Sequence, residues 1–150
     1  MTQEDKQLLL KDISARLPYG VKCIVTKSRT EEGQKGDVGK IGWVSLEGVD
    51  CIGDREPFFS EFGNFKPYLF PLSSMTERQK EELNKKFNVQ FSGNDIYSIH
   101  HHSEGYWDTD LELDLQDWLW FINWCYKNHF DIYGLISMGL AIDATGLNIY

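Results

Sequence analysis

Hydrophobic residues recur at helical spacing most clearly between Leu113 and Phe130. At about 100° per residue, one side of this predicted helix collects the residues that we assign to the core: Leu115, Trp118, Leu119, Ile122, Cys125, Tyr126 and His129. The other side carries Trp120, Phe121 and Trp124 among polar residues. Two tryptophans one turn apart on that side need a cover, which either segment 54–72 or another molecule would supply.

Two further helices are predicted from their N-terminal signals. Thr2 begins a capping-box-like pattern for a helix that runs to about Leu17, where a proline and a glycine follow. Thr76 and Gln79 form a second capping box, which opens a charged helix that ends at Asn88. Few apolar residues line this second helix, so we expect only one of its sides to touch the core.

The remaining hydrophobic runs are short and predict strands. β-Branched residues between turn signals indicate three strands, at 21–26, 38–46 and 49–53. The segment 54–72 contains three prolines and six aromatic residues, which favours an extended segment at a sheet edge or across the core over a central strand. A further hairpin is expected at 89–99, and the glycine-containing tail after Phe130 reads as a docked strand and turn.

These elements predict an α+β fold. A small antiparallel sheet or partial barrel in the N-terminal half would pack with the long aromatic helix of the C-terminal half. A length of 150 residues suits one domain, with a β-rich half to about residue 72 and a helical half at 73–150.

Composition and charge narrow the classes of function. The net charge of −8 argues against direct nucleic-acid binding, which depends on clustered Lys and Arg. Cys23, Cys51 and Cys125 are an odd set in apolar surroundings, typical of reduced, buried thiols. The acidic N-terminus resembles neither a signal peptide nor an anchor, and no apolar run is long enough to span a membrane. We therefore expect a cytoplasmic protein that does not enter the membrane.

A histidine triplet is the strongest candidate for metal chemistry. Imidazoles at i and i+2 on a strand point to the same side, so His100 and His102, with Glu104 and Asp108, would hold a divalent transition metal and support a metal-dependent hydrolase. The alternative is a polar strand end without a metal, and in that case we expect no cofactor. The alternating acidic residues from Asp108 to Asp114 do not form a calcium loop, because the glycine and the glutamate that such a loop requires are missing. Asp114 instead fits the N-terminal cap of the following helix.

Other catalytic signals are missing from the sequence. It contains no nucleophile elbow, phosphate-binding loop or paired-cysteine motif. The tripeptide from His101 to Ser103 matches half of a two-histidine phosphodiesterase site, but no second half exists, because Asp131 stands where His129 would need a hydroxyl. An enzyme is thus unsupported.

The surplus of aromatic residues indicates a binding surface. Trp120, Phe121 and Trp124 would form a face for a protein partner or a homo-oligomer, and further aromatic residues would extend it: Trp43, Trp107, Phe58, Phe59, Phe62 and Phe65. The alternative is that the helix is buried on both sides.

Three stretches resemble a family of small uncharacterised proteins from gut bacteria and their phages and mobile elements. The stretches are KDISARLPYGVKC (11–23), KPYLFPLSSMTERQKEEL (66–83) and NHFDIYGLISMGLAIDATGLNIY (128–150). The resemblance implies a cytoplasmic, mobile-element setting and brings no known activity or site.

Three hypotheses of function follow. The first is a non-enzymatic accessory protein of a phage or mobile element that acts through protein–protein contacts. The second is an anti-defence protein that inhibits a host protein or sequesters a small nucleotide signal, with aromatic rings on the base and the phosphate met by a few of Lys22, Lys27, Arg29, Lys35 and Lys40. The third is the hydrolase at the histidine triplet.

Overall fold

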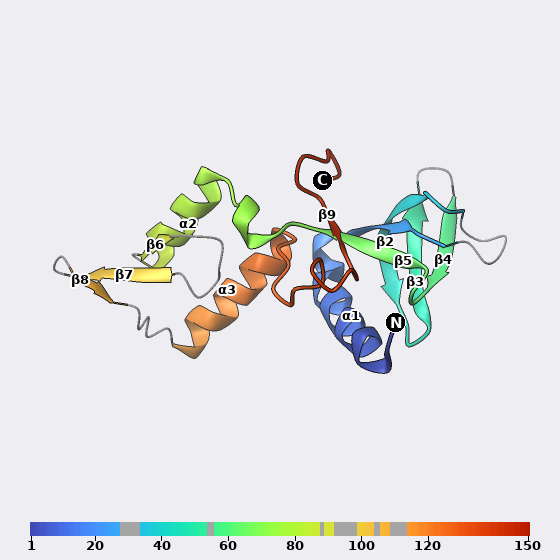
Figure 1. The fold of residues 1–150 in the computed structure, drawn as a ribbon, viewed down its shortest axis with the longest axis horizontal. Coiled ribbons are helices and arrows are strands. Elements are labelled where there is room, and N and C mark those ends of the chain that lie inside the picture. Colours follow the sequence, from blue (N-terminus) through green and yellow to red (C-terminus); the bar gives the residue numbers. More distant parts are fainter. Residues whose placement is uncertain (28–33, 54–55, 88, 92–98, 104–105, 109–113) are drawn as a thin grey trace.

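The computed structural model places a sheet with one helix at one end of the molecule and the other two helices at the opposite end (Figure 1). It describes the chain except for a few segments, and it describes no side chains between residues 88 and 113. The described ranges are 1–27, 34–53, 56–87, 89–91, 99–103, 106–108 and 114–150.

The first end of the molecule contains helix α1, a single 3₁₀ turn and strands β1 to β5. Their bounds are α1 Gln3–Arg16, η1 Leu17–Tyr19, β1 Lys22–Val25, β2 Val38–Val44, β3 Gly48–Gly53, β4 Pro57–Glu61 and β5 Phe65–Leu69. The second end contains η2 Leu72–Ser74, α2 Glu77–Phe87, β6 Val89–Phe91, β7 Ile99–Ser103, β8 Tyr106–Asp108 and α3 Leu115–Lys127. The tail returns to the first end and adds β9 Ile142–Asp143. The predicted α+β class is confirmed.

In the main sheet, β1 to β4 form a meander, and β5 returns to pair with β1. Its order is β4-β3-β2-β1-β5-β9, antiparallel except for the parallel pair of β5 and β9. The prolines of 54–72 do not keep this segment out of the sheet. β4 lies at an edge and begins with Pro57, as expected, but β5 lies inside the sheet with Pro67 opposite Cys23. The proline is tolerated because β9 pairs only with Tyr68 and Leu69, beyond it.

Helix α1 covers the inner side of the sheet. The Thr2 hydroxyl accepts a bond from the Asp5 N–H at 3.1 Å while the Asp5 carboxylate accepts from the Thr2 N–H at 2.8 Å, so the predicted capping box is present. Leu9 and Ile13 are buried against the sheet. Leu135 and Ala141 of the tail join the same core cluster. The tail thus docks as expected and contributes to the core of the N-terminal half.

A second core cluster lies between α2 and α3. It contains seven buried residues: Met75, Leu83, Phe87, Phe121, Trp124, Cys125 and Phe130. The second capping box is also confirmed, because the Thr76 hydroxyl accepts from the Gln79 N–H at 3.3 Å. At the start of α3, the Asp114 carboxylate accepts from the Asp117 N–H at 2.8 Å, as the acidic sequence predicted.

The predicted core side of α3 is wrong in its first half. Leu115 is 71% exposed, and Trp118 and Leu119 are exposed as well. The helix instead buries Phe121 and Trp124, at 0% and 5% exposure. The aromatic rings offer more surface for burial than the leucines do, and α2 supplies the matching cover with Leu83 and Phe87. Segment 54–72 reaches this cluster through its last residues, at Phe70 and Leu72.

A buried ion pair within α1 also forms a hydrogen bond to the chain just after α3. The Arg16 Nε and Nη2 atoms donate to the Asp12 carboxylate at 2.7 and 2.8 Å, and both side chains are 0% exposed. Nη2 also donates to the Phe130 carbonyl at 2.7 Å, and the guanidinium lies 5.0 Å from the centre of the Tyr126 ring. Burial raises the pKa of Asp12, and its bonds to Arg16 oppose that effect.

His129 completes this junction from the end of α3. Its N–H donates to the Tyr126 carbonyl and the Phe130 N–H donates to the Cys125 carbonyl, the two bonds of a Schellman motif. His129 occupies the position that glycine prefers, with φ of 58°, and its ring stacks on Tyr150 at 3.9 Å. We call Asp12, Arg16, Tyr126, His129 and Tyr150 the junction cluster.

The first prediction concerns the buried ion pair. Replacing Arg16 with Met leaves the Asp12 carboxylate buried without its partner, and we expect the free energy of unfolding to fall by about 3 to 5 kcal/mol. Urea denaturation at pH 7 measures this loss. Lys80→Met is the matched control: it removes the exposed pair with Glu77 and should cost less than about 1 kcal/mol. Equal losses in the two variants would contradict the assignment.

The second prediction concerns the protonation of His129. Burial, and secondly the charge of Arg16, lower its pKa from 6.5 to about 4. The unfolded chain therefore binds a proton between pH 6.5 and 4 that the folded chain does not, so stability falls as the pH falls through this window. The full loss corresponds to about 3 kcal/mol.

Urea denaturation of the wild type and of His129→Asn, at steps from pH 7.5 to 4, checks this dependence. Asparagine also tolerates a positive φ but does not titrate, so its curve should fall less steeply. Parallel curves would show that His129 does not carry the effect.

Candidate functional site

The strongest candidate for a binding surface is the outer side of strands β2, β3 and β4. Trp43, Leu46 and Ile52 are 65%, 75% and 60% exposed. Phe59 of β4, half-buried, lies beside them, because β3 pairs Asp50 with both Trp43 and Phe59. We call Trp43, Leu46, Ile52 and Phe59 the outer sheet face.

Local backbone features place these side chains on the outer sheet face. The register of β2 and β3 shifts between Ile41 and Trp43, so Trp43 departs from the simple alternation of the strand. Gly48 lets β3 and β4 approach closely beside Phe59. A Cβ there would lie 2.2 Å from the Ser60 carbonyl oxygen and 2.8 Å from the Phe59 ring.

The rim of the outer sheet face is acidic. Exposed carboxylates stand around it at Glu47, Glu56 and Glu61, and a further one, Asp50, lies between Trp43 and Phe59. Lys40, opposite Ile52 on β2, is an exposed cation at the same surface. An apolar centre with a charged rim is the usual arrangement of a protein–protein interface, and tryptophan is enriched at the residues that dominate binding energy.

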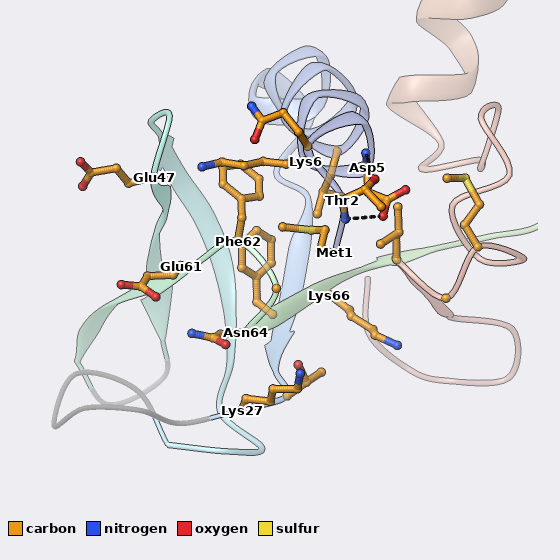
Figure 2. Close-up of a pocket in the computed structure, with 18 residues that line it drawn as sticks. Met1, Thr2, Asp5, Lys6, Lys27, Glu47, Glu61, Phe62, Asn64 and Lys66 are labelled. Atoms are coloured by element: carbon orange, nitrogen blue, oxygen red, sulfur yellow. Dashed lines mark hydrogen bonds between the residues drawn. The ribbon is translucent and has the colours of Figure 1, made fainter.

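The second candidate is a cavity at the N-terminal end of α1 (Figure 2). It is open to solvent and has a volume of about 940 Å³ between this end, the turn after β4, the start of β5 and the tail at 138–140. Its charged lining is mixed, with three lysines and three carboxylates: Lys6, Lys27, Lys66, Asp5, Glu47 and Glu61. Phe62 forms part of one wall, with the Lys6 ammonium 5.5 Å from the centre of its ring.

The junction cluster has perturbed pKa values but not the form of an active site. Burial lowers the pKa of His129 and raises that of Tyr150 to about 12. Such shifts accompany both catalytic sites and structural ion-pair networks. The pocket described above does not include these residues, and Asp12 and Arg16 are fully buried. We therefore assign the cluster to the architecture.

The aromatic residues predicted to bind a partner have mostly internal roles. Phe121 and Trp124 are buried in the second core cluster. Trp120 is half-buried and stacks on Trp124 at 6.4 Å, with the edge of Phe87 at 5.4 Å. In this conformation Phe121 and Trp124 are covered by the chain itself. Trp43, which the sequence offered only as an extension of that face, is 65% exposed, and the side chain of Trp107 lies outside the described residues.

The predicted metal ligands lie largely outside the described part of the chain. The backbone of β7 contains His100 and His102 and that of β8 contains Asp108, but their side chains and all of Glu104 are not described. Among the residues that are described, no three His, Cys, Asp or Glu side chains gather as a metal site. Cys23 and Cys51 face each other at 3.2 Å between their sulfur atoms and are buried, as is Cys125, as expected for core thiols.

The lysines predicted to meet a phosphate have separate surroundings. Lys22 donates to the Ile149 carbonyl at 2.6 Å, whereas Lys27 lines the cavity. Lys35 and Lys40 are exposed, and Arg29 lies outside the described residues. The pocket lysines Lys6 and Lys66 were missed because they lie in other elements, α1 and β5.

Comparison with known proteins adds no relative to this picture. Within the described residues, no helix has the length and apolarity needed to cross a membrane. The chain matches no protein-family model, no curated protein and no solved structure.

Proposed function

We propose that the chain is a non-enzymatic, cytoplasmic accessory protein that binds another protein through the outer sheet face. The supporting observation is the 65% exposure of Trp43 on β2 beside the exposed Ile52 on β3, with Leu46 exposed in the turn between these strands. Exposing a large indole and two aliphatic side chains to water costs free energy, and a partner that covered them would remove this cost. The resemblance to proteins of gut-bacterial phages and mobile elements suggests the setting in which this partner occurs.

The partner is proposed to be a different protein with a basic rim. In a symmetric homodimer built on the outer sheet face, the same surface would meet itself. Four carboxylates and one lysine on each copy would then face the same acidic set, and like charges at an interface cost several kcal/mol. A partner that presents apolar side chains surrounded by Lys and Arg satisfies both the centre and the rim.

The third prediction tests Trp43 directly. The tagged protein is expressed in its natural host, and co-purified proteins are compared between the wild type, Trp43→Ala and Trp118→Ala. Trp118 is the matched control, because it is also an exposed tryptophan, at 39%, but lies on α3. We expect one protein to be retained by the wild type and Trp118→Ala and lost from Trp43→Ala.

The retained protein is then purified, and its dissociation constant is measured against all three chains. Trp43→Ala should weaken binding by at least about thirtyfold, which corresponds to the 2 kcal/mol typical of a central interface tryptophan. Added salt should weaken binding further through the acidic rim. Loss in Trp118→Ala with retention in Trp43→Ala would contradict the proposal, as would self-association that Trp43→Ala abolishes. Unchanged thermal unfolding of both variants excludes misfolding as the cause.

A further inference from the structure

The open edge of the main sheet lies directly beside the outer sheet face. In the described part of the chain, β4 pairs with β3 only, and it is the outermost strand of the sheet in Figure 1. At the other end of the sheet, β9 of the tail covers β5 over Tyr68 and Leu69. A strand with an open edge is a template for a further strand. Because Phe59 belongs both to β4 and to the outer sheet face, the two form one continuous surface.

The hydrogen bonds between β3 and β4 determine which backbone groups of β4 face outward. The Phe62 N–H donates to the Glu47 carbonyl at 3.1 Å. In the continuous register of the two strands, the backbone groups of Ser60 and Phe58 therefore also point to β3, because hydrogen-bonded and non-hydrogen-bonded pairs alternate. Phe59, between them, points its N–H and its carbonyl to the open edge.

The two ends of this edge limit how a further strand can pair with it. The Glu61 N–H points outward as the Phe59 N–H does, but the Glu61 carbonyl already accepts the Asn64 N–H at 3.0 Å. Pro57, at the other end, has no N–H and offers only its carbonyl. The edge therefore suits a short extended segment rather than a long strand.

The side chains of β4 alternate between the core and the outer sheet face. Phe58 and Ser60 are buried, whereas Phe59 is half-buried and Glu61 is exposed. Every second side chain of an added segment would lie on the same side as Phe59, about 5 Å from its neighbour on β4. The position beside Phe59 favours an apolar side chain, and the position beside Glu61 favours Lys or Arg.

We propose that the partner adds a short extended segment to β4, with apolar and basic side chains at every second position. This inference rests on the proposed function, because it specifies how the partner uses the outer sheet face. Backbone hydrogen bonds would provide affinity, and the alternate side chains would provide specificity. A second copy of the chain fits less well. In a two-fold pair of β4 strands centred on Phe59, Glu61 would face Pro57 of the other copy, which offers no countercharge.

Amide exchange of the full chain in the presence of a synthetic peptide tests the proposal. The probe is the capped peptide Lys-Thr-Ile-Thr-Val-Thr-Lys, and the control is Thr-Thr-Ile-Val-Lys-Lys-Thr, which has the same composition without this alternation. With the probe at twice its dissociation constant, exchange of the Phe59 and Glu61 amides, measured by NMR, should slow about threefold, because one third of the chain remains unbound. The Phe58 and Ser60 amides already bond to β3 and should change little.

The variants Phe59→Ala and Phe59→Pro separate the contribution of the backbone from that of the ring. Both remove the ring from the outer sheet face, but only proline also removes the N–H. Proline is tolerated on an edge strand where the N–H faces solvent. We expect Phe59→Pro to bind the probe peptide about tenfold more weakly than Phe59→Ala, because it lacks one backbone hydrogen bond and leaves a carbonyl of the peptide unpaired.

Any of four results would overturn strand addition: unchanged exchange at Phe59 and Glu61, equal affinity of the two peptides, equal affinity of the two variants, or self-association that Phe59→Pro abolishes. If Phe59→Pro does not fold, the exchange measurement on the wild type still decides. Strand addition and the proposed function fail separately. Retention of the co-purified protein by Trp43→Ala rejects the proposed function, whereas the exchange of the Phe59 amide does not depend on that result.

Discussion

The fold depends on the buried guanidinium of Arg16, which contacts three parts of the chain. Removing the Arg16 guanidinium from water has a large free-energy cost, which only close hydrogen-bonding partners offset. Asp12, one helical turn earlier, supplies the countercharge, and the Phe130 carbonyl, just after α3, supplies a further acceptor. Because Phe130 belongs to the second core cluster, Arg16 gains this acceptor only when α3 is docked. The ion pair therefore favours one relative placement of the two cores.

His129 sets the path of the chain on the other side of this contact. A left-handed residue after α3 reverses the chain direction, so that Phe130 returns onto Trp124 with ring centres 5.5 Å apart. The Phe70 N–H then donates to the His129 carbonyl, and the Asp131 N–H to the Phe70 carbonyl. These bonds join the end of β5 to the end of α3. Glycine would adopt this conformation at lower cost, but it would lose the ring that stacks on Tyr150.

Local sequence signals predicted the helices and strands. Which side of α3 is buried depends on packing against other elements, which the sequence does not reveal. The caps at Thr2, Thr76 and Asp114 form as expected, because a cap involves only residues three positions apart. The core side of α3 was assigned from spacing, and both of its sides are apolar enough to be buried. Which side packs depends on α2, about thirty residues away, and on the return of Phe130. The outer sheet face was not clearly predicted for a similar reason. Simple alternation along β2 would put Trp43 on the same side as Ile41, and the register shift between these two residues puts Trp43 on the other side.

The distribution of charge explains why net charge alone is a weak guide to ligands of this protein. The carboxylates Glu47 and Glu61 stand between the outer sheet face and the pocket that Lys6, Lys27 and Lys66 line, and the net charge of the chain does not show this local arrangement. Electrostatic attraction in salt solution acts over about 10 Å, so each surface is governed by its own neighbours. The carboxylates beside Trp43 therefore favour a basic partner at the outer sheet face, whatever charges the rest of the chain carries.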